Sequence, residues 1–167
     1  KLVPFGEFLP LENILNKFGL KKITEGHGSF LSGNDQRSLK ILNANILPLI
    51  CYEIIFPELI QNSDRETNLV VNISEDGWFG NSIGPHQHFA KGIFRAIEQN
   101  TFFIRSANKG ISAIISNKGT VLKKLDPNEA GNIEFVVPLI LNKNKNKNDL
   151  IFFVLLITYI FIFNFYK

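Results

Sequence analysis

One cysteine, Cys51, lies in the sequence ICYEIIF, directly before Tyr52 and Glu53. A thiolate is a strong nucleophile that can accept an acyl group, but it requires a lowered pKa and a nearby proton acceptor. Cys51 ends an apolar stretch, and a strand that leads into a sharp turn holds a sulfur atom that is rigid and reachable. The alternative is a small buried hydrophobic side chain, the ordinary role of a lone cysteine. A single cysteine also excludes an internal disulfide.

Other side chains that could take part in chemistry are spread along the first half of the chain. Glu7 follows a Pro-Phe-Gly turn and is either an active-site carboxylate or an ordinary loop carboxylate. His86 and His88 lie two residues apart at the beginning of an expected helix. No Cys, His or carboxylate stands at a supporting spacing, so we expect no metal site. Trp78 is either part of the core or lines a pocket for an acyl chain or substrate.

Two apolar runs are expected to position Cys51. Residues 45–55 (NILPLICYEII) and 68–74 (NLVVNIS) are short and almost unbroken, which is typical of strands buried on both faces. If the first strand continues past its cysteine, alternation places Cys51 and Glu53 on one face and Tyr52 on the other. Residues 84–100 then show apolar side chains at helical spacing, and Pro85 suits a first turn.

The region after this helix predicts a series of antiparallel strands. A turn at residues 117–119 (Asn-Lys-Gly) predicts a hairpin, and Asn108 and Gly110 are expected to shape a turn near the site. The strand-like runs are residues 102–105, 111–116, 121–125 and 133–138. Strands, one helix and further strands together predict an α/β or α+β sheet fold.

Composition divides the 167 residues into a globular part at 1–141, a polar linker at 142–149 and an apolar segment at 150–167. Hydrophobic residues make up 45% of the chain, enough for a core. The net charge is only +3 and the basic residues are scattered, which argues against nucleic-acid binding.

The apolar C-terminal segment predicts a transmembrane helix. Residues 150–165 carry no formal charge, and a helix of this length spans about 24 Å, slightly less than a hydrocarbon core of about 30 Å. The alternative is a buried core helix or a pair of strands. Three lysines in the linker, Lys143, Lys145 and Lys147, favour a cytoplasmic position for that side.

Six sequence motifs together resemble the apolipoprotein N-acyltransferases, a membrane-bound branch of the nitrilase superfamily. The motifs are LVPFGEFLPLE at 2–12, ICYEIIFPEL at 50–59, NLVVNISEDGWFG at 68–80, SIGPHQHF at 82–89, FRAIE at 94–98 and IRSANKGISA at 104–113.

The resemblance implies a nitrilase-like αββα sandwich on the periplasmic side of the bacterial inner membrane. It implies that Cys51 is the nucleophile, Glu7 an additional essential glutamate, Tyr52 and Glu53 neighbours of the nucleophile, and Trp78 a residue that supports the site or binds substrate. The acyl donor is a membrane phospholipid and the acceptor a diacylglyceryl apolipoprotein. No cofactor is implied.

The resemblance also has gaps. The family's triad lysine and general-base glutamate match no residue here, since Lys1 falls beside the lysine position and not on it. A smaller departure is Glu75, which stands where the family usually has asparagine. We therefore expect this chain to be a fragment that is inactive alone, or one completed by an upstream half of the same enzyme. The alternatives are a membrane-tethered domain that binds lipid or lipoprotein without turnover, and a carbon–nitrogen amidase.

Overall fold

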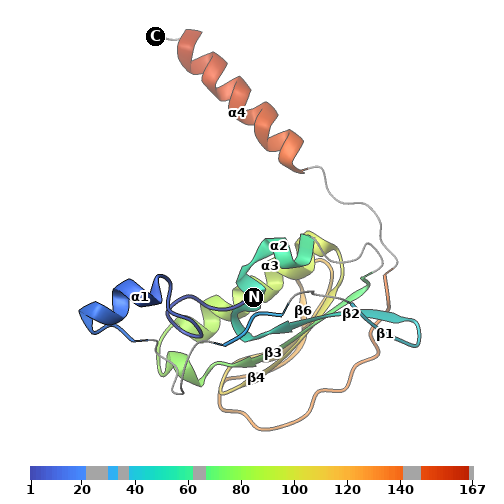
Figure 1. Cartoon of the computed structure of the whole chain (residues 1–167). Helices are drawn as coiled ribbons and strands as arrows, with labels where there is room; N and C mark the ends of the chain where they lie inside the picture. Colours follow the sequence, from blue (N-terminus) through green and yellow to red (C-terminus); the bar gives the residue numbers. More distant parts are fainter. Residues whose placement is uncertain (22–29, 34–37, 62–66, 141–147, 166–167) are drawn as a thin grey trace.

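The computed structural model describes residues 1–21, 30–33, 38–61, 67–140 and 148–165 (Figure 1). A six-stranded sheet forms its centre. In chain order the elements are α1 (Glu12–Leu15), η1 (Asn16–Phe18), β1 (Leu39–Ile41), β2 (Ala44–Ile50), η2 (Cys51–Ile55), α2 (Pro57–Gln61), β3 (Leu69–Glu75), η3 (Gly77–Phe79), α3 (Gly84–Gln99), β4 (Phe102–Asn108), β5 (Ser112–Ile115), β6 (Val121–Leu125) and α4 (Asn148–Phe165).

The sheet is mixed, with strands in the order β1-β2-β3-β4-β5-β6. β2, β3 and β4 are parallel, and the outer pairs β1/β2, β4/β5 and β5/β6 are antiparallel. Each parallel pair needs a crossover, which η2 and α2 supply between β2 and β3, and η3 and α3 between β3 and β4. The predicted α/β fold is therefore confirmed, although β4 is parallel to its neighbour where we expected an antiparallel strand.

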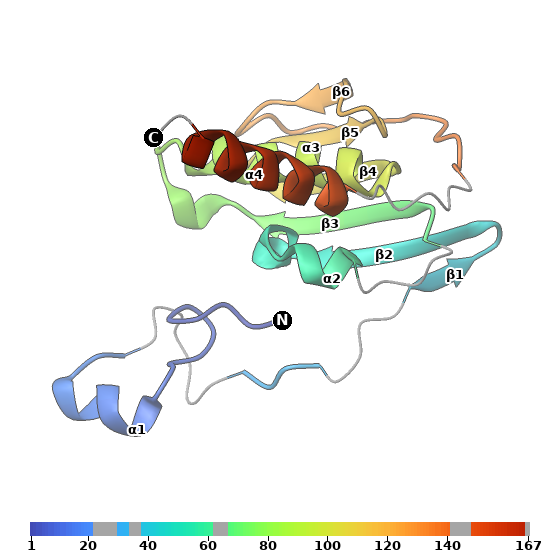
Figure 2. The same cartoon turned by 90° about the horizontal axis from the view of Figure 1, so that it is seen from above.

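Helices α2 and α3 cover one face of the sheet, as Figures 1 and 2 both show. Burial of apolar side chains between these layers supplies the main core. It consists of Leu47, Leu49, Ile54, Ile60, Val70, Ala96, Phe103, Ile111, Ala113 and Ile115. Leu47 and Leu49 alternate along β2, and Val70 of β3 and Phe103 of β4 lie on the same face, as the alternation of strands requires.

The opposite face of the sheet carries a smaller apolar cluster of Leu69, Phe102 and Ile114. The predicted strand at 133–138 is wrong, because this segment has no regular secondary structure and pairs with no strand. Ile133 and Val137 instead pack against the cluster from the segment that runs along this face in Figure 1, whereas Phe135 and Val136 are exposed. Partial side-chain burial, without backbone pairing, accounts for the strand-like pattern of the segment.

The central helix and the hairpin agree with prediction. α3 runs from Gly84 to Gln99, has proline in its first turn and ends at Asn100, whose φ of 47° is left-handed. The turn between β5 and β6 contains Gly119 at φ 80°, and its N–H donates to Ser116 O at 2.9 Å. The short helices α1, η1 and α2 were not predicted from the sequence.

The apolar C-terminal segment forms α4, and its side chains from Leu150 to Asn164 are exposed. Within the described residues, no helix combines the length and apolarity needed to cross a membrane, so the transmembrane prediction is unconfirmed. Of the predicted linker, residues 142–147 lie outside the described residues, and the remaining two begin α4. Hydroxyl and amide groups of Thr158 and Asn164 donate to helix carbonyls one turn earlier.

Candidate active site

The carboxyl ends of the three parallel strands meet at one edge of the sheet, and Cys51 lies there. Ile50, the last residue of β2, is in register with Ile73 of β3, which is in register with Ser106 of β4. In open sheets with parallel strands this edge is where ligands bind, because the loops that leave the strands open a crevice there.

Cys51 itself has a left-handed backbone, with φ 49°. β2 ends at Ile50, so the prediction that Cys51 ends a strand that leads into a turn is confirmed. The rest of the apolar run at 45–55 is not strand, because residues 51–55 form the 3-10 helix η2. The alternation of Cys51, Tyr52 and Glu53 that a continued strand would give therefore does not occur. A left-handed conformation costs a residue with a Cβ about 1–2 kcal/mol, so surrounding contacts must hold this turn.

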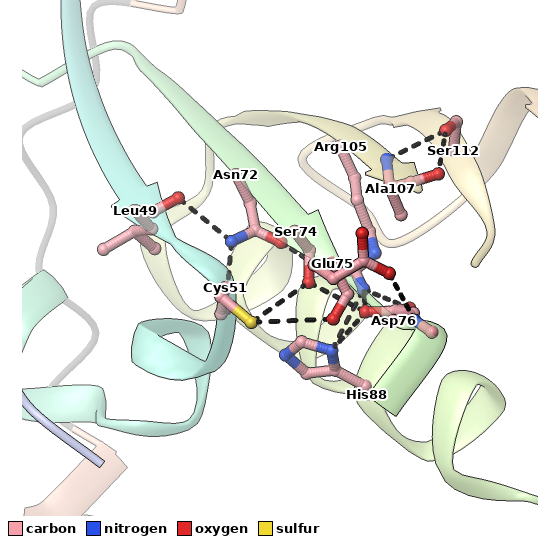
Figure 3. A network of polar contacts seen from close by, with 11 residues as sticks. Leu49, Cys51, Asn72, Ser74, Glu75, Asp76, His88, Arg105, Ala107 and Ser112 are labelled. Atoms are coloured by element: carbon pink, nitrogen blue, oxygen red, sulfur yellow. Dashed lines mark hydrogen bonds and ion pairs between the residues drawn. The ribbon is translucent and has the colours of Figure 1, made fainter. Parts of the chain in front are cut away.

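Asn72 supplies two of those contacts. Its amide Nδ2 donates to the carbonyl oxygens of Leu49 at 3.1 Å and of Cys51 at 3.2 Å, on both sides of the turn (Figure 3). Asn72 is completely buried, and its own Oδ1 accepts a hydrogen bond from Arg105 Nη1. The backbone of Cys51 is thus anchored to the neighbouring strand and, through it, to β4.

Arg105 and Asp76 form a buried ion pair behind the cysteine. Arg105 Nη2 donates to Asp76 Oδ2 at 2.7 Å and Oδ1 at 2.8 Å, and neither side chain is accessible to solvent. Ser74 Oγ donates to Asp76 Oδ1 at 2.7 Å, and His88 Nδ1 lies 3.0 Å from the same oxygen. Removing one partner of such a pair would leave an uncompensated buried charge.

These contacts set the protonation of Asp76. Burial is the largest influence and opposes ionisation, but the hydrogen bond from His88, the charge of Arg105 and the further hydrogen bonds outweigh it. Together they lower the pKa of Asp76 from 3.8 to about 2. Asp76 is therefore ionised at neutral pH and a poor proton acceptor, so it is not the base that a thiol nucleophile requires.

The sulfur of Cys51 has two neighbours in this network. Ser74 Oγ lies 3.6 Å from Sγ, and the carbonyl oxygen of Glu75 lies 3.9 Å from it. Figure 3 shows Sγ next to Ser74, whose hydroxyl is also joined to Asp76. His88 packs its ring against Tyr52 and Phe79, with centroid distances of 5.5 and 5.6 Å.

The loop after β4 closes the network from another side, as predicted for Asn108 and Gly110. Asp76 N–H donates to Asn108 O at 2.9 Å, and Asn108 Nδ2 donates to the carboxylate of Glu75. A side chain at Gly110 would overlap the carboxylate of Asp76. Glu75, which departs from the usual asparagine, accepts hydrogen bonds from the loops on both sides, since its Oε1 also caps Gly77 N–H at 2.7 Å.

Of the predicted site residues, Tyr52 and Glu53 follow Cys51 directly in η2, and Glu7 lies in the N-terminal turn. Tyr52 contacts the network through His88, and Glu53 Oε2 accepts the Ile50 N–H at 2.8 Å and so caps η2. Glu7 closes its own turn, accepting the Val3 N–H at 2.9 Å. In the described part of the chain, no hydrogen bond or ion pair joins Glu7 to Cys51.

Trp78 and Lys1 also lie near this region. Trp78 is 65% exposed in η3, directly after Asp76 and Gly77, so it is not a core residue. The Lys1 ammonium pairs with Glu58 and lies 4.3 Å from the ring centroid of Phe56, and no contact joins it to Cys51. The expectation that Lys1 is not the triad lysine remains a prediction.

The sequence reasoning missed the buried polar residues around Cys51. They are Asn72, Ser74, Asp76, His88 and Arg105. A signal was present, since on β3 the residues at 70, 72 and 74 share one face and change from apolar to polar towards Cys51, and Asp76 follows directly after the strand. On β4 the same change occurs between Phe103 and Arg105.

A cavity of about 360 Å³ opens beside the network, between η3, the beginning of α3 and the loops after β4 and β6. Asp76 and Gly77 form part of its wall, together with Lys109 and His86. Among the residues that the structure describes, no group of three His, Cys, Asp or Glu side chains could hold a metal ion.

Comparison with known proteins identifies the family. The profile of the carbon–nitrogen hydrolase family matches residues 20–139, which include the strand-end cysteine and the network around it. The chain belongs to the carbon–nitrogen hydrolase family. A CN-hydrolase superfamily protein from Xanthomonas campestris has the same fold, with a TM-score of 0.53 and 18% identity over 68% of this chain and 46% of that one.

Sequence relatives narrow the comparison. The chain is 43% identical over 138 residues to an apolipoprotein N-acyltransferase from Rhodopseudomonas palustris. The aligned region covers 82% of this chain and 26% of the relative. The chain is also 42% identical over 137 residues to one from Rhizobium leguminosarum, covering 81% of this chain and 26% of the relative. The chain therefore spans about a quarter of the length of these relatives.

Proposed function

We propose that this chain forms the cysteine-bearing part of an apolipoprotein N-acyltransferase. The observation that carries the proposal is the single cysteine at the carboxyl end of β2, held in a left-handed turn by Asn72. The names of the relatives, at 43% and 42% identity across this region, support the reaction class. The six-stranded sheet would be one half of an αββα sandwich.

In the first half-reaction, the Cys51 thiolate attacks the ester carbonyl carbon of a membrane phospholipid. The tetrahedral intermediate expels the lysophospholipid alkoxide, which takes up a proton, and an acyl thioester remains on Sγ. In the second half-reaction, the α-amine of a diacylglyceryl-cysteine apolipoprotein attacks this thioester. The Cys51 thiolate leaves, and the nitrogen loses one proton as the amide forms. No cofactor takes part.

Both half-reactions need a proton acceptor and a cation beside the sulfur. In the part of the chain that the structure describes, no lysine contacts Cys51, and the nearby carboxylate of Asp76 is held by Arg105. We therefore propose that the base and the cation come from an upstream part of the same enzyme. Glu7 would approach the site only when that part is present, and Trp78, exposed near the cavity, would contact substrate.

We also propose that α4 anchors the domain to the bacterial inner membrane, with the sheet on the periplasmic side. Its exposed apolar side chains need a nonpolar partner, and its 18 residues correspond to about 27 Å against a hydrocarbon thickness of about 30 Å. The internal hydrogen bonds of Thr158 and Asn164 support this assignment, since polar groups in lipid must be satisfied within the helix.

Intact-mass spectrometry tests the acyl transfer. The chain is incubated with phospholipid in detergent, with and without the upstream half of a related enzyme, beside Cys51→Ala. We expect a mass increase of one fatty acyl group when the upstream half is present, which hydroxylamine removes and which Cys51→Ala lacks. No increase with a folded chain and a competent upstream half would refute the proposal and favour a domain that binds lipid without turnover.

A further inference from the structure

The cavity beside the network has a polar wall that includes a lysine. Its volume of about 360 Å³ falls within the range of ligand-binding pockets, roughly 300–1,000 Å³. Asp76 and Gly77, which follow β3, line it together with Lys109 from the loop after β4. A Cβ added at Gly77 would lie 3.2 Å from Lys109 Cδ, so the stem of this lysine passes directly over Gly77. The cation at the end of that stem therefore belongs to the cavity.

The carboxylates near Lys109 already have other partners. Asp76 is paired with Arg105, and the carboxylate of Glu75 accepts hydrogen bonds from the loops on both sides. Within the described residues, no carboxylate forms an ion pair with Lys109. The positive charge of the lysine is thus available in the cavity, and this favours an anionic ligand.

Hydrogen-bond donors surround this cation. The first turn of the 16-residue helix α3 reaches the cavity at Pro85 and His86, and a helix N-terminus attracts anions. Ser82 Oγ accepts the Gly84 N–H at 3.1 Å, so its own hydroxyl proton can be donated to a ligand. Further donors on the wall are the side chains of Asn81, His86 and Asn128. Donors on several sides of one cation match a phosphate group, whose charged oxygens only accept hydrogen bonds.

The cavity also lies close to the sulfur of Cys51. Asp76 forms part of its wall, and the Ser74 hydroxyl lies 2.7 Å from Asp76 Oδ1 and 3.6 Å from Cys51 Sγ. In a glycerophospholipid, the phosphate and the ester groups are attached to the same glycerol. A phosphate held in the cavity would therefore bring an ester carbonyl towards Cys51.

We propose that this cavity binds a phosphate group, that of the headgroup of the phospholipid acyl donor, with Lys109 as its cationic contact. The inference rests on the proposed function for the identity of the donor. A free phosphate ion carries the same oxygens, so the test has to separate the two sources.

Trp78 supplies the readout, because it is the single tryptophan of the chain and directly follows Gly77 of the cavity wall. The full 167-residue chain, in an uncharged detergent, is titrated with dihexanoyl phosphatidylglycerol, with dihexanoylglycerol and with inorganic phosphate while Trp78 fluorescence is recorded. We expect a saturable change with the phospholipid and none with dihexanoylglycerol, which lacks the phosphate. Inorganic phosphate that binds as tightly as the phospholipid would overturn the headgroup as the source.

Substitution of Lys109 tests the cation. Lys109→Gln should raise the dissociation constant for the phospholipid about fivefold or more, because a charge-assisted hydrogen bond is lost, whereas Lys109→Arg keeps the charge and should bind within about twofold of wild type. Lys118→Gln, at an exposed lysine in the turn between β5 and β6, is the matched control and should bind like wild type. Equal binding by Lys109→Gln and wild type, or an equal response to dihexanoylglycerol, would overturn the proposal.

Neither titration requires acyl transfer. Binding that depends on Lys109 would stand even if the acyl-transfer assay failed. Successful acyl transfer without such binding would refute the phosphate site and leave the acyltransferase proposal standing.

Discussion

Replacing Asp76 with asparagine should remove a pH-dependent contribution to stability whose size follows from the structure. The pKa of Asp76 is lowered from 3.8 to about 2 in the folded chain. At 1.36 kcal/mol per pKa unit, this difference corresponds to about 2 kcal/mol. Because the folded-state pKa is the lower one, the stabilisation is complete above the unfolded pKa of 3.8 and is lost as the pH falls through about 2.

The assay is urea denaturation followed by circular dichroism, in mild detergent, at several pH values between about 6 and about 2. Asp76→Asn should be less stable than wild type at pH 6 by this amount and by a further cost for leaving Arg105 unpaired. Arginine stays charged throughout this range, so its cost is a constant offset. The difference between the two proteins should therefore shrink by about 2 kcal/mol as the pH is lowered.

Asp126→Asn is the matched control, because Asp126 is an exposed aspartate paired with Lys124 at the surface. The control should lie within about 0.5 kcal/mol of wild type at each pH. A difference between Asp76→Asn and wild type that stays constant from pH 6 to pH 2 would show that Asp76 has no lowered pKa.

Three further substitutions test the same region. Arg105→Lys keeps the charge but cannot serve Asn72 and both oxygens of Asp76, so we expect a loss of about 1–3 kcal/mol in chemical denaturation, and a loss below about 0.5 kcal/mol would contradict the role of the guanidinium geometry. Cys51→Gly should be about 1 kcal/mol more stable than Cys51→Ala, since glycine adopts φ 49° without strain, and equal melting temperatures would refute the strained turn. Gly110→Ala places a Cβ against the carboxylate of Asp76 and should lower the free energy of unfolding by about 2 kcal/mol or more. The control Gly33→Ala, with open space around its Cβ, should leave the free energy of unfolding unchanged. Equal stabilities of the two variants would show that the loop at Gly110 moves freely.

The strands and the long helix were predictable because their patterns are local. Buried strands give short apolar runs, and α3 gives apolar residues at helical spacing after a proline. The pattern at 133–138 misled because burial against the second face of the sheet produces the same apolar run without any backbone pairing. The apolar run at 45–55 extends past the end of β2, because it continues through η2 without interruption.

The residues around Cys51 were harder to predict because they are neighbours only across strands. Ser74 and Asp76 are more than 20 positions from Cys51, and Arg105 is more than 50 positions from it. Their polarity reads as ordinary strand-end character in a single sequence. The parallel register of β2, β3 and β4 brings them together. Neither the register nor the parallel pairing can be predicted from the apolar pattern of a single strand.

By itself the sequence determined most of the strands, the long helix α3 and the family, because the apolar periodicity and the motifs around Cys51 are local properties of the chain. The tertiary structure decided the surroundings of Cys51. It ended β2 at Ile50, turned the cysteine into a left-handed conformation, and placed Ser74 and the carbonyl of Glu75 beside its sulfur. The physical reason is that these residues are far apart in the sequence, and only packing across the sheet sets the distances between them.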